Sequence, residues 1–338
     1  MIKNLDIKEI KISLRKRIKL YLNMVQEIES YLTQNPEEWG RFQGEFNEKV
    51  DEIFRDIMDF EQNNLSKGDE EKVYKLKKIF IDKFRPIFNR GDYCKWTLDK
   101  PYGYAGDFKI IDDIYQNYPK TTGFDRLFDN YFQMSAMAVA VRNRKDDFKR
   151  FLADFINKRK KQNLRIMDLA SGPCRDLKEL LYIENFSCEH VIFDCYDSDP
   201  RAIKFGKKLL RKYNNVNFFK ENAVRIAFKK DITSLIDKKY DCIFSTGLLD
   251  YFNEKIAVKL IRNLKKLLRP NGSLFIANIR DKYCNPSVFF LEWGGDWNLV
   301  YRDEEEFKKI FINAGFVKNE IKIKYEQQGI MQYVIASP

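Results

Sequence analysis

The sequence predicts an α/β fold, in which a helical N-terminal region precedes a doubly wound sheet of seven strands. Apolar residues recur every three or four positions through the first third of the chain, a spacing typical of amphipathic helices. Five short apolar runs then alternate with helix-like segments between residues 164 and 279, and two alternating runs end the chain. Because 338 residues exceed the size of one ordinary domain, we expect two, over residues 1–122 and 123–338.

The N-terminal domain is expected to be entirely helical. Apolar positions recur over residues 7–32, and Asn35-Pro36 ends this first helix. Further apolar stripes predict helices over residues 42–57 and 73–84. These stripes are rich in Phe, and Phe at helical spacing normally forms a core. We therefore expect packing from these helices, and no chemistry of their own.

A segment rich in aromatic residues and glycine, GDYCKWTLDKPYGYAGD, follows over residues 91–107. Neither helix nor strand favours this composition, so we expect an ordered loop with exposed polar aromatic residues, namely Tyr93, Trp96, Tyr102 and Tyr104. Loops of this kind often carry function. The alternative is an aromatic plug that joins the two domains. Asp107 is expected to cap a helix that runs to Tyr115.

Residues 124–155 have a helical pattern and carry two arginines beside an apolar stretch. The stretch MSAMAVAV can face a core, while Arg142 and Arg144 project from one end of the helix. A guanidinium binds a carboxylate or phosphate through two parallel hydrogen bonds, so both arginines are candidates for binding an acid. The alternative is a surface helix whose arginines form ion pairs with Asp146 and Asp147.

The stretch RIMDLASGPCRD, residues 165–176, predicts a strand, a tight turn and the start of a helix. Small residues at Ala170, Ser171 and Gly172 let the backbone approach a ligand closely. The turn has neither G-x-G-x-x-G nor G-x-x-x-x-G-K-[ST], so we expect a nucleoside without a pyrophosphate. The next strand ends at Asp197, whose carboxylate can accept hydrogen bonds from both ribose hydroxyls.

The rest of the chain completes the sheet and its helices. Apolar periodicity predicts helices over residues 202–210 and 254–268 and around residues 307–311, strands over residues 215–223, 242–249 and 273–279, and a closing hairpin from residues 321–325 and 331–335. In such a fold the carboxyl ends of the parallel strands form the edge that binds the ligand.

The composition argues against several other classes of protein. The formal net charge is +11, but lysine is spread over nearly every expected helix, which favours a solvated surface over a nucleic-acid partner. The six cysteines form no C-x-x-C pair and the one histidine is His190, so we expect neither disulfides nor a zinc site. No apolar run reaches the ~18 residues of a membrane span and the N-terminus has no signal-peptide pattern, so we expect a cytoplasmic protein.

Several motifs, met in order along the chain, resemble the class I S-adenosylmethionine-dependent methyltransferases, whose fold is Rossmann-like. The turn Asp168-Leu-Ala-Ser-Gly is similar to the family's D/E-x-G-x-G, with Ala170 in place of the first glycine and Cys174 in place of the last. Asp197 matches the ribose-binding acid, the Asn-Ala pair at 222–223 matches the adenine contact, and YDCIFSTGLLDYF matches the fourth strand and its loop. The resemblance implies S-adenosylmethionine as methyl donor or co-substrate, and no catalytic metal. The implied cofactor-binding residues are Asp168, Ala170, Ser171, Gly172, Asp197, Ser198, Asn222, Ala223, Thr246 and Gly247.

From about residue 100 to the C-terminus, the likeness is to one subgroup. The loop PYGYAGD, the helix AVRNR and the segment EWGGDWNLVYRDEEEF resemble the bacterial 3-hydroxy fatty acid methyl ester synthases, which methylate a carboxylate. This likeness implies a small or lipid-like acid as substrate, contacted by Tyr102, Asp107, Arg142 and Arg144. Because a methyltransferase core alone leaves its strand ends open to water, we expect the helical domain to act as a lid.

Two kinds of nucleophile remain open. A carboxylate arrives ionised and needs only a binding clamp, for which Tyr102, Tyr104 and the two arginines are candidates. A hydroxyl or amine needs a proton acceptor, for which Asp250 and Tyr251 are placed just after the fourth strand.

Two other functions also remain open at this point. One is cyclisation of S-adenosylmethionine itself, which releases methylthioadenosine and a cyclic amino acid. The other is non-catalytic nucleoside binding for regulation. In each case we expect a small-molecule or lipid-like partner and no nucleic acid, and the sequence does not predict the oligomeric state.

Overall fold

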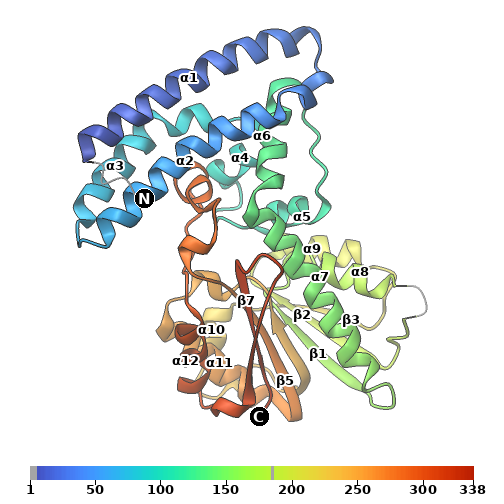
Figure 1. Cartoon of the computed structure of the whole chain (residues 1–338). Coiled ribbons are helices and arrows are strands. Elements are labelled where there is room, and N and C mark those ends of the chain that lie inside the picture. The colour runs from blue at the N-terminus through green and yellow to red at the C-terminus, as the bar shows by residue number, and fades with distance from the viewer. Residues whose placement is uncertain (1–5, 184–185) are drawn as a thin grey trace. The chain divides into compact units, whose positions relative to one another are not determined.

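The computed structural model describes residues 6–183 and 186–338, and the chain divides into two compact units (Figure 1). The helical unit comprises Met1–Val139 and Asn285–Asn298, and the sheet unit comprises Ala140–Cys284 and Leu299–Pro338. Residues 123–139 and 285–298 thus belong to the helical unit, whereas the sequence-based division assigned them to the catalytic domain. The functional boundary after residue 122 stays a prediction.

The helical unit has an aromatic core. Its main helices are α1 (Ile7–Gln34), α2 (Gln43–Leu65), α3 (Glu70–Lys83), α4 (Gly91–Asp99), α5 (Phe108–Gln116) and α6 (Gly123–Met134). Asp6 starts α1 with a capping box. Phe46 is fully buried, and its ring meets the rings of Phe124, Phe128 and Tyr131 edge to face. The Phe-rich stripes of the sequence therefore form a core, as expected.

One expectation about this unit is wrong, because residues 91–99 form the helix α4 and not a loop. This short helix buries Tyr93 and Thr97 on one side and packs against α6. The Tyr93 N–H donates to Oδ1 of Asp129 at 3.1 Å. Contacts with the rest of the unit thus outweigh a composition that disfavours helix. Residues 100–107 form turns, as expected.

The helix expected over residues 124–155 is interrupted at Ser135. α6 ends before this residue, and α7 (Ala136–Asn157) starts after it. Ser135 has an extended ψ of 142°, and its Oγ accepts a hydrogen bond from the Ala138 N–H at 3.2 Å. A serine that accepts from the backbone of the following turn is typical of a helix start. One apolar pattern therefore covers two helices.

The sheet unit is built on a seven-stranded sheet in the order β3-β2-β1-β4-β5-β7-β6. The strands are β1 (Leu164–Leu169), β2 (Val191–Asp197), β3 (Val216–Lys220), β4 (Tyr240–Ser245), β5 (Leu268–Ile279), β6 (Ile321–Tyr325) and β7 (Met331–Ala336). β1 to β5 pair in parallel, and β7 runs antiparallel to both β5 and β6. The predicted doubly wound sheet with a C-terminal antiparallel hairpin is confirmed.

Helices cover both faces of this sheet (Figure 1). α7, α8 (Arg175–Leu181) and α9 (Pro200–Leu209) lie on one face, and α10 (Ala223–Phe228), α11 (Glu254–Leu267) and α12 (Glu304–Asn313) lie on the other. A sheet buried on both faces needs apolar side chains on both, which explains why its strands read as continuous apolar runs. Within residues 6–183 and 186–338, no helix is long and apolar enough to cross a membrane.

The order in which the chain adds strands to the sheet changes side between β1 and β4, which pair in parallel near its centre. From β1 the chain continues to β2 and β3 on one side, and from β4 it continues to β5 on the other. The loops that leave the carboxyl ends of these two strands therefore diverge and leave a crevice. This edge of the sheet is where the sequence-predicted cofactor residues lie.

Candidate cofactor and substrate site

The turn after β1 keeps a glycine-type backbone although two of its positions are not glycine. Ala170, Gly172 and Cys174 all have positive φ, at 57°, 52° and 52°. The left-handed conformation costs a residue with a Cβ roughly 1–2 kcal/mol. The Ser171 N–H donates to the Tyr196 carbonyl at 3.1 Å, which fixes the turn against β2. The departures from D/E-x-G-x-G thus leave the shape of the turn intact.

Asp197, at the end of β2, is held against this turn. Its Oδ2 accepts a hydrogen bond from the Gly172 N–H at 2.9 Å, and its Oδ1 accepts one from the Asp199 N–H at 2.8 Å. A carboxylate has about four acceptor positions, and these backbone bonds do not use all of them, so Asp197 can still accept from a ribose hydroxyl. Burial raises the pKa of Asp197, and the backbone N–H groups of Asp199, Gly172 and Ser198 act in the opposite direction.

Asp168 carries a buried oxygen with no partner among the described residues. The residue is 4% exposed, and its Oδ2 makes no hydrogen bond. Burial raises the pKa of Asp168 well above its ordinary value, and the nearby carboxylate of Asp176 acts in the same direction. Burial likewise raises the pKa of Asp176 to about 6. A buried carboxylate oxygen without a hydrogen bond costs free energy unless a ligand supplies a donor or a positive charge.

These residues fit the cofactor that the resemblance implies. Asp197 can bind ribose hydroxyls, and the unpartnered oxygen of Asp168 can accept from an ammonium group. A Cβ built on Gly172 would meet no atom within 4 Å, so the space beside the turn is open. S-adenosylmethionine carries both a ribose and an ammonium group, together with a positive sulfonium.

The other predicted cofactor residues follow strands on the same edge. Asn222 is the N-cap of α10, where its Oδ1 accepts from the Val224 N–H at 2.7 Å, and Ala223 is the first residue of that helix. Ser198 directly follows β2, and residues 246–247 directly follow β4. Since the carboxyl ends of parallel strands share one edge, the structure brings these residues together there. Their contact with a cofactor stays a prediction.

Arg144 reaches this edge from α7. Its side chain is 5% exposed, and Nη1 lies 3.6 Å from Oδ2 of Asp250. A Cβ built on Gly247 would lie 3.3 Å from both terminal nitrogens of the guanidinium. Arg142 is half-buried on the same helix, and burial lowers its pKa. Of the two arginines, Arg144 is therefore the one placed at the end of β4.

Two residues of this site were missed by the sequence analysis. Asn278 on β5 is fully buried and donates to Oδ1 of Asp250 at 2.8 Å, and the Ile279 N–H donates to the same oxygen at 2.6 Å. Arg302 is also buried and donates to the carbonyl of Leu249 at 3.0 Å and to Oδ1 of Asn278. A polar Asn inside the apolar run SLFIANI was the available signal. Nothing in the pattern around Arg302 indicated a buried arginine.

Both carboxylate oxygens of Asp250 already face donors or a positive charge in this network. One carboxylate oxygen accepts from Asn278 and the Ile279 backbone, and the other faces Arg144. Burial raises the pKa of Asp250, while Arg144 and the backbone N–H oppose that change. Asp250 is thus placed to hold the arginine and the loop after β4. Tyr251, the second predicted proton acceptor, is 41% exposed at the end of that loop.

The remaining predicted substrate residues belong to the helical unit. Asp107 accepts hydrogen bonds from the N–H groups of Lys109 and Ile110 at 2.8 and 3.1 Å, so the expected cap of α5 is confirmed. Tyr102 stacks on Phe108 with ring centroids 5.3 Å apart, and Tyr104 is 42% exposed. Contact of Tyr102, Tyr104 or Asp107 with a substrate stays a prediction.

Three potential metal ligands lie close together behind the turn. The ligand atoms of Asp168, Cys174 and Cys195 are within 4.8 Å of one another, and all three residues are buried. Thiols bind metals as thiolates, but the hydrogen bond between the thiols of Cys195 and Cys174, together with burial, raises the pKa of Cys195 well above its ordinary value. The group therefore favours neutral thiols that pack in the core.

Known proteins with a similar sequence domain or fold are consistent with the sheet described above. A family model described as a methyltransferase domain matches residues 160–321, and no curated protein sequence matches the chain. A possible exported protein from Bordetella parapertussis is 16% identical, over 68% of this chain and 79% of its own, with a TM-score of 0.56. The CurJ carbon methyltransferase is 12% identical, over 92% of this chain and 70% of its own, with a TM-score of 0.50. At these identities the two structures show a shared fold alone.

Residues 160–321, slightly less than half of the chain, thus match a model of a methyltransferase domain. The predicted enzyme class, an S-adenosylmethionine-dependent transferase, is confirmed, and a cofactor of the S-adenosylmethionine type follows from the domain. The comparisons do not identify the acceptor.

Proposed function

We propose that the protein transfers the methyl group of S-adenosylmethionine to the carboxylate of a small or lipid-like acid. The observation that carries this proposal is the position of Arg144. Its buried guanidinium lies against Gly247 at the carboxyl end of β4, on the edge that holds the cofactor residues. A guanidinium in a water-poor site binds a carboxylate strongly and in a defined orientation.

The cofactor, when bound, supplies a methyl group that is already activated for transfer. In this proposal Asp197 binds the ribose hydroxyls, the residues at 222–223 contact the adenine, and Asp168 faces the ammonium group. The left-handed turn at 170–174 lets the backbone approach closely. These roles are supported by the oxygen of Asp168 that makes no hydrogen bond and by the position of the Asp197 carboxylate beside the turn.

The acceptor carboxylate is ionised at neutral pH and needs no general base. This agrees with the engagement of Asp250, whose oxygens face Asn278, a backbone N–H and Arg144. Asp250 then acts as a positioning residue, because its charge holds the guanidinium in one orientation. What this chain contributes to the reaction is mainly orientation of the acid and exclusion of water.

A first experiment identifies the acceptor. The protein is incubated with methyl-labelled S-adenosylmethionine and hydroxy fatty acids, amino acids or total RNA, while S-adenosylhomocysteine and methylthioadenosine are assayed separately. We expect label in a base-labile methyl ester together with S-adenosylhomocysteine. Methylthioadenosine without a methylated product would establish the cyclisation of S-adenosylmethionine instead, and label in RNA would contradict the acid.

A second experiment tests Arg144. Arg144→Ala removes a charge-assisted interaction worth ~1.5–3 kcal/mol, so KM for the acid should rise about ten- to a hundredfold. The matched control is Arg150→Ala on the same helix, where the arginine is exposed and paired with Asp147. If the Arg144 variant instead loses affinity for S-adenosylhomocysteine and keeps its KM for the acid, the arginine serves the cofactor.

We also propose that the helical unit acts as a lid during the reaction. The proposal is supported by the open strand ends of a methyltransferase core and by the need to exclude water from methyl transfer. Hydrogen exchange measured with and without S-adenosylhomocysteine tests it, because a lid should be protected by the ligand around residues 100–107. Protection confined to residues 165–250 would contradict the lid.

A further inference from the structure

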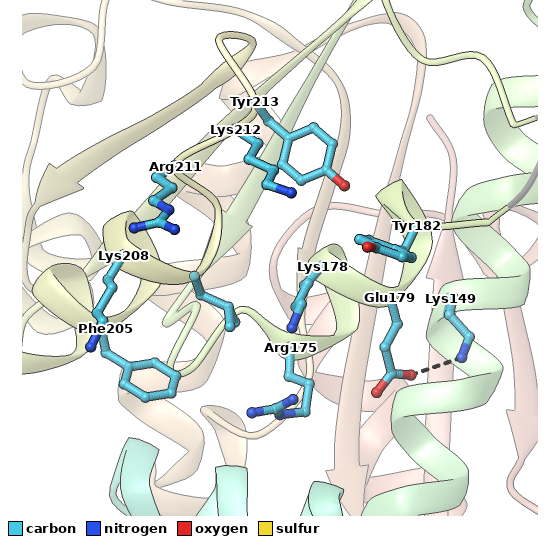
Figure 2. A pocket seen from close by; sticks show the side chains of 11 residues that line it. Lys149, Arg175, Lys178, Glu179, Tyr182, Phe205, Lys208, Arg211, Lys212 and Tyr213 are labelled. Carbon is cyan, nitrogen blue, oxygen red and sulfur yellow. Dashed lines mark hydrogen bonds and ion pairs between the residues drawn. The ribbon is translucent and has the colours of Figure 1, made fainter.

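A large hollow on the sheet unit is lined mainly by cations (Figure 2). Its volume is about 830 Å³, which is within the usual range of pockets that bind small molecules. Six of its lining residues carry a positive charge, and together we call them the basic pocket: Lys149, Arg175, Lys178, Lys208, Arg211 and Lys212. Asp168 and Asp197 do not line it, so the basic pocket is separate from the cofactor residues described above.

These cations converge from separate elements. Lys149 comes from α7, Arg175 and Lys178 come from α8, and the other three come from the end of α9 and the turn after it. Lysine near the end of one helix is explained by the negative end of its dipole, and that accounts for Lys208. It also accounts for Lys178 in the last turn of α8, but not for Arg175 at the start of that helix or for Lys149 on α7. Figure 2 shows the side chains of α8 on one side and those of α9 and the following turn on the other.

Among the residues that the structure describes, one carboxylate lines the hollow, and it is already neutralised. Glu179 forms ion pairs with Lys145 at 2.7 Å and with Lys149 at 2.9 Å. The described lining residues therefore carry five more positive charges than negative ones, since six cations face one carboxylate. Because these cations line one hollow, an anion with several charges would bind there with favourable energy.

Aromatic rings make up part of the wall. Tyr182, Phe205 and Tyr213 line the hollow from α8, α9 and the turn after α9. Tyr182 is exposed, and Tyr213 and Phe205 are partly exposed. An exposed ring offers a flat face on which a heteroaromatic base can stack. Charge and rings in one hollow thus match a ligand that has both phosphates and an aromatic base.

We propose that the basic pocket is a second ligand site, which binds a nucleoside polyphosphate. The number of cations favours two or more phosphate groups, the rings favour a base, and a volume of about 830 Å³ matches the size of a small molecule. This inference does not depend on the identity of the methyl acceptor.

The test is a titration of the full chain with GTP, GDP, GMP and guanosine, in the presence of saturating S-adenosylhomocysteine. The bound S-adenosylhomocysteine keeps the nucleotides out of the cofactor site. Affinity should fall in that order as phosphates are removed, and should weaken as salt is raised because screening reduces the attraction. Guanosine that binds as tightly as GTP, or no binding by any of the four, would overturn the proposal.

A pair of double variants separates the basic pocket from general surface charge. Lys178→Ala with Arg211→Ala should weaken GTP binding about tenfold or more, because both side chains line the hollow. Lys204→Ala with Lys230→Ala removes the same net charge from exposed positions outside it and should leave the affinity within about twofold. Equal weakening in the two variants would overturn the proposal.

A single-stranded RNA of twelve nucleotides is titrated in the same way as the nucleotides. Binding of the RNA without binding of GTP would show that the hollow is part of a nucleic-acid surface, and the small-molecule site would be wrong. Thermal unfolding of both double variants checks that each remains folded, and the replaced side chains are not part of the core.

Discussion

The sheet unit places two opposite charge clusters at the two sides of one short helix, α8. On the cofactor side, the carboxylates of Asp168, Asp176 and Asp197, which we call the acidic edge, are buried, and burial raises the pKa of each. On the other side, the basic pocket keeps its cations exposed or half-exposed. Buried charge is costly, and it is tolerated where a ligand offsets the cost. The acidic edge therefore indicates a tightly enclosed cation, and the basic pocket a hydrated anion.

The largest expected effect is a loss of affinity for the adenosyl ligands when the acidic edge is changed, with no change in the basic pocket. Asp197→Ala removes hydrogen bonds from a charged acceptor and should weaken S-adenosylmethionine and S-adenosylhomocysteine by ~1.5–3 kcal/mol, or about ten- to a hundredfold. GTP binding in the basic pocket should be unchanged. Calorimetry with each ligand measures both effects, and equal affinity of variant and wild type for S-adenosylhomocysteine would remove Asp197 from the site. NADH should not bind, and NADH that binds more tightly than the adenosyl ligands would contradict the cofactor assignment.

The second effect concerns Gly206, which lies on α9 between the two clusters. A Cβ there would lie 2.6 Å from Cε1 of Phe218 and 3.3 Å from Sγ of Cys174. Gly206→Ala should therefore destabilise the fold by about 1–2 kcal/mol, because overpacking outweighs the better helix propensity of alanine. Gly44→Ala is the matched control, since a Cβ on Gly44 meets no atom within 4 Å. Denaturant unfolding of both variants measures this, and equal stability would show that Phe218 moves away at little cost.

A third, smaller effect is the pH dependence of the acidic edge. The pKa of Asp176 is about 6 in the folded chain and about 3.9 when unfolded, so the folded state binds this proton more tightly. Its contribution to stability is then complete below about pH 4 and is lost as pH rises through 6. A cationic ligand prefers the ionised carboxylate, so affinity for S-adenosylmethionine should rise several-fold from pH 5 to pH 7 and then level off.

Two variants check the origin of this profile. Asp176→Asn cannot titrate and should flatten it, although Glu179, Lys145 and Arg144 still act on the position. The double variant of Lys178 and Arg211 should keep the wild-type profile, since both side chains line the basic pocket and neither is among the groups that shift the pKa of Asp176. Calorimetry between pH 5 and 8 gives the affinities, and a profile that persists in Asp176→Asn would assign the titration to another group.

The smallest effect tests the backbone of the turn. Ala170 is exposed and has a φ of 57°, so Ala170→Gly removes left-handed strain of ~1–2 kcal/mol and adds unfolded-state entropy worth about 0.4–1 kcal/mol. The variant should be more stable by about 0–1.6 kcal/mol and should bind S-adenosylhomocysteine normally. Urea unfolding measures the change, and a loss of stability would mean that the methyl group of Ala170 makes a needed contact.

The sequence predicted most of the sheet unit because its signals are local. Buried parallel strands are continuous apolar runs, and the turn after β1 is marked by its small residues. The helix α4 was missed because its stability comes from Asp129 and α6, which lie far along the chain. Ser135 was missed as a break because one apolar stripe continues through both helices. Contacts between distant parts of the chain thus determine these two features, which local composition does not predict.

In the candidate site, too, the sequence predicted only the residues that a local pattern marks. Asp168 and Asp197 lie at the carboxyl ends of β1 and β2, and strand ends can be found from apolar runs. The burial of Arg144 and its contact with Gly247 depend on how α7 packs on the sheet, which no local pattern contains. Asn278 and Arg302 were missed because polar residues that bond to one another inside a core leave no periodic signal.

The network that links Arg144, Asp250, Asn278 and Arg302 also has a consequence for the order of folding. Its members come from α7, from the loop after β4, from β5 and from the segment before α12, so their contacts span more than a hundred residues of chain. Contacts between distant segments form late, because the entropy of closing long loops opposes them. A nascent chain that has not yet completed β5 therefore lacks the partners that orient Arg144. The orientation of Arg144 that the proposed function needs should consequently be reached only when the last third of the chain is present.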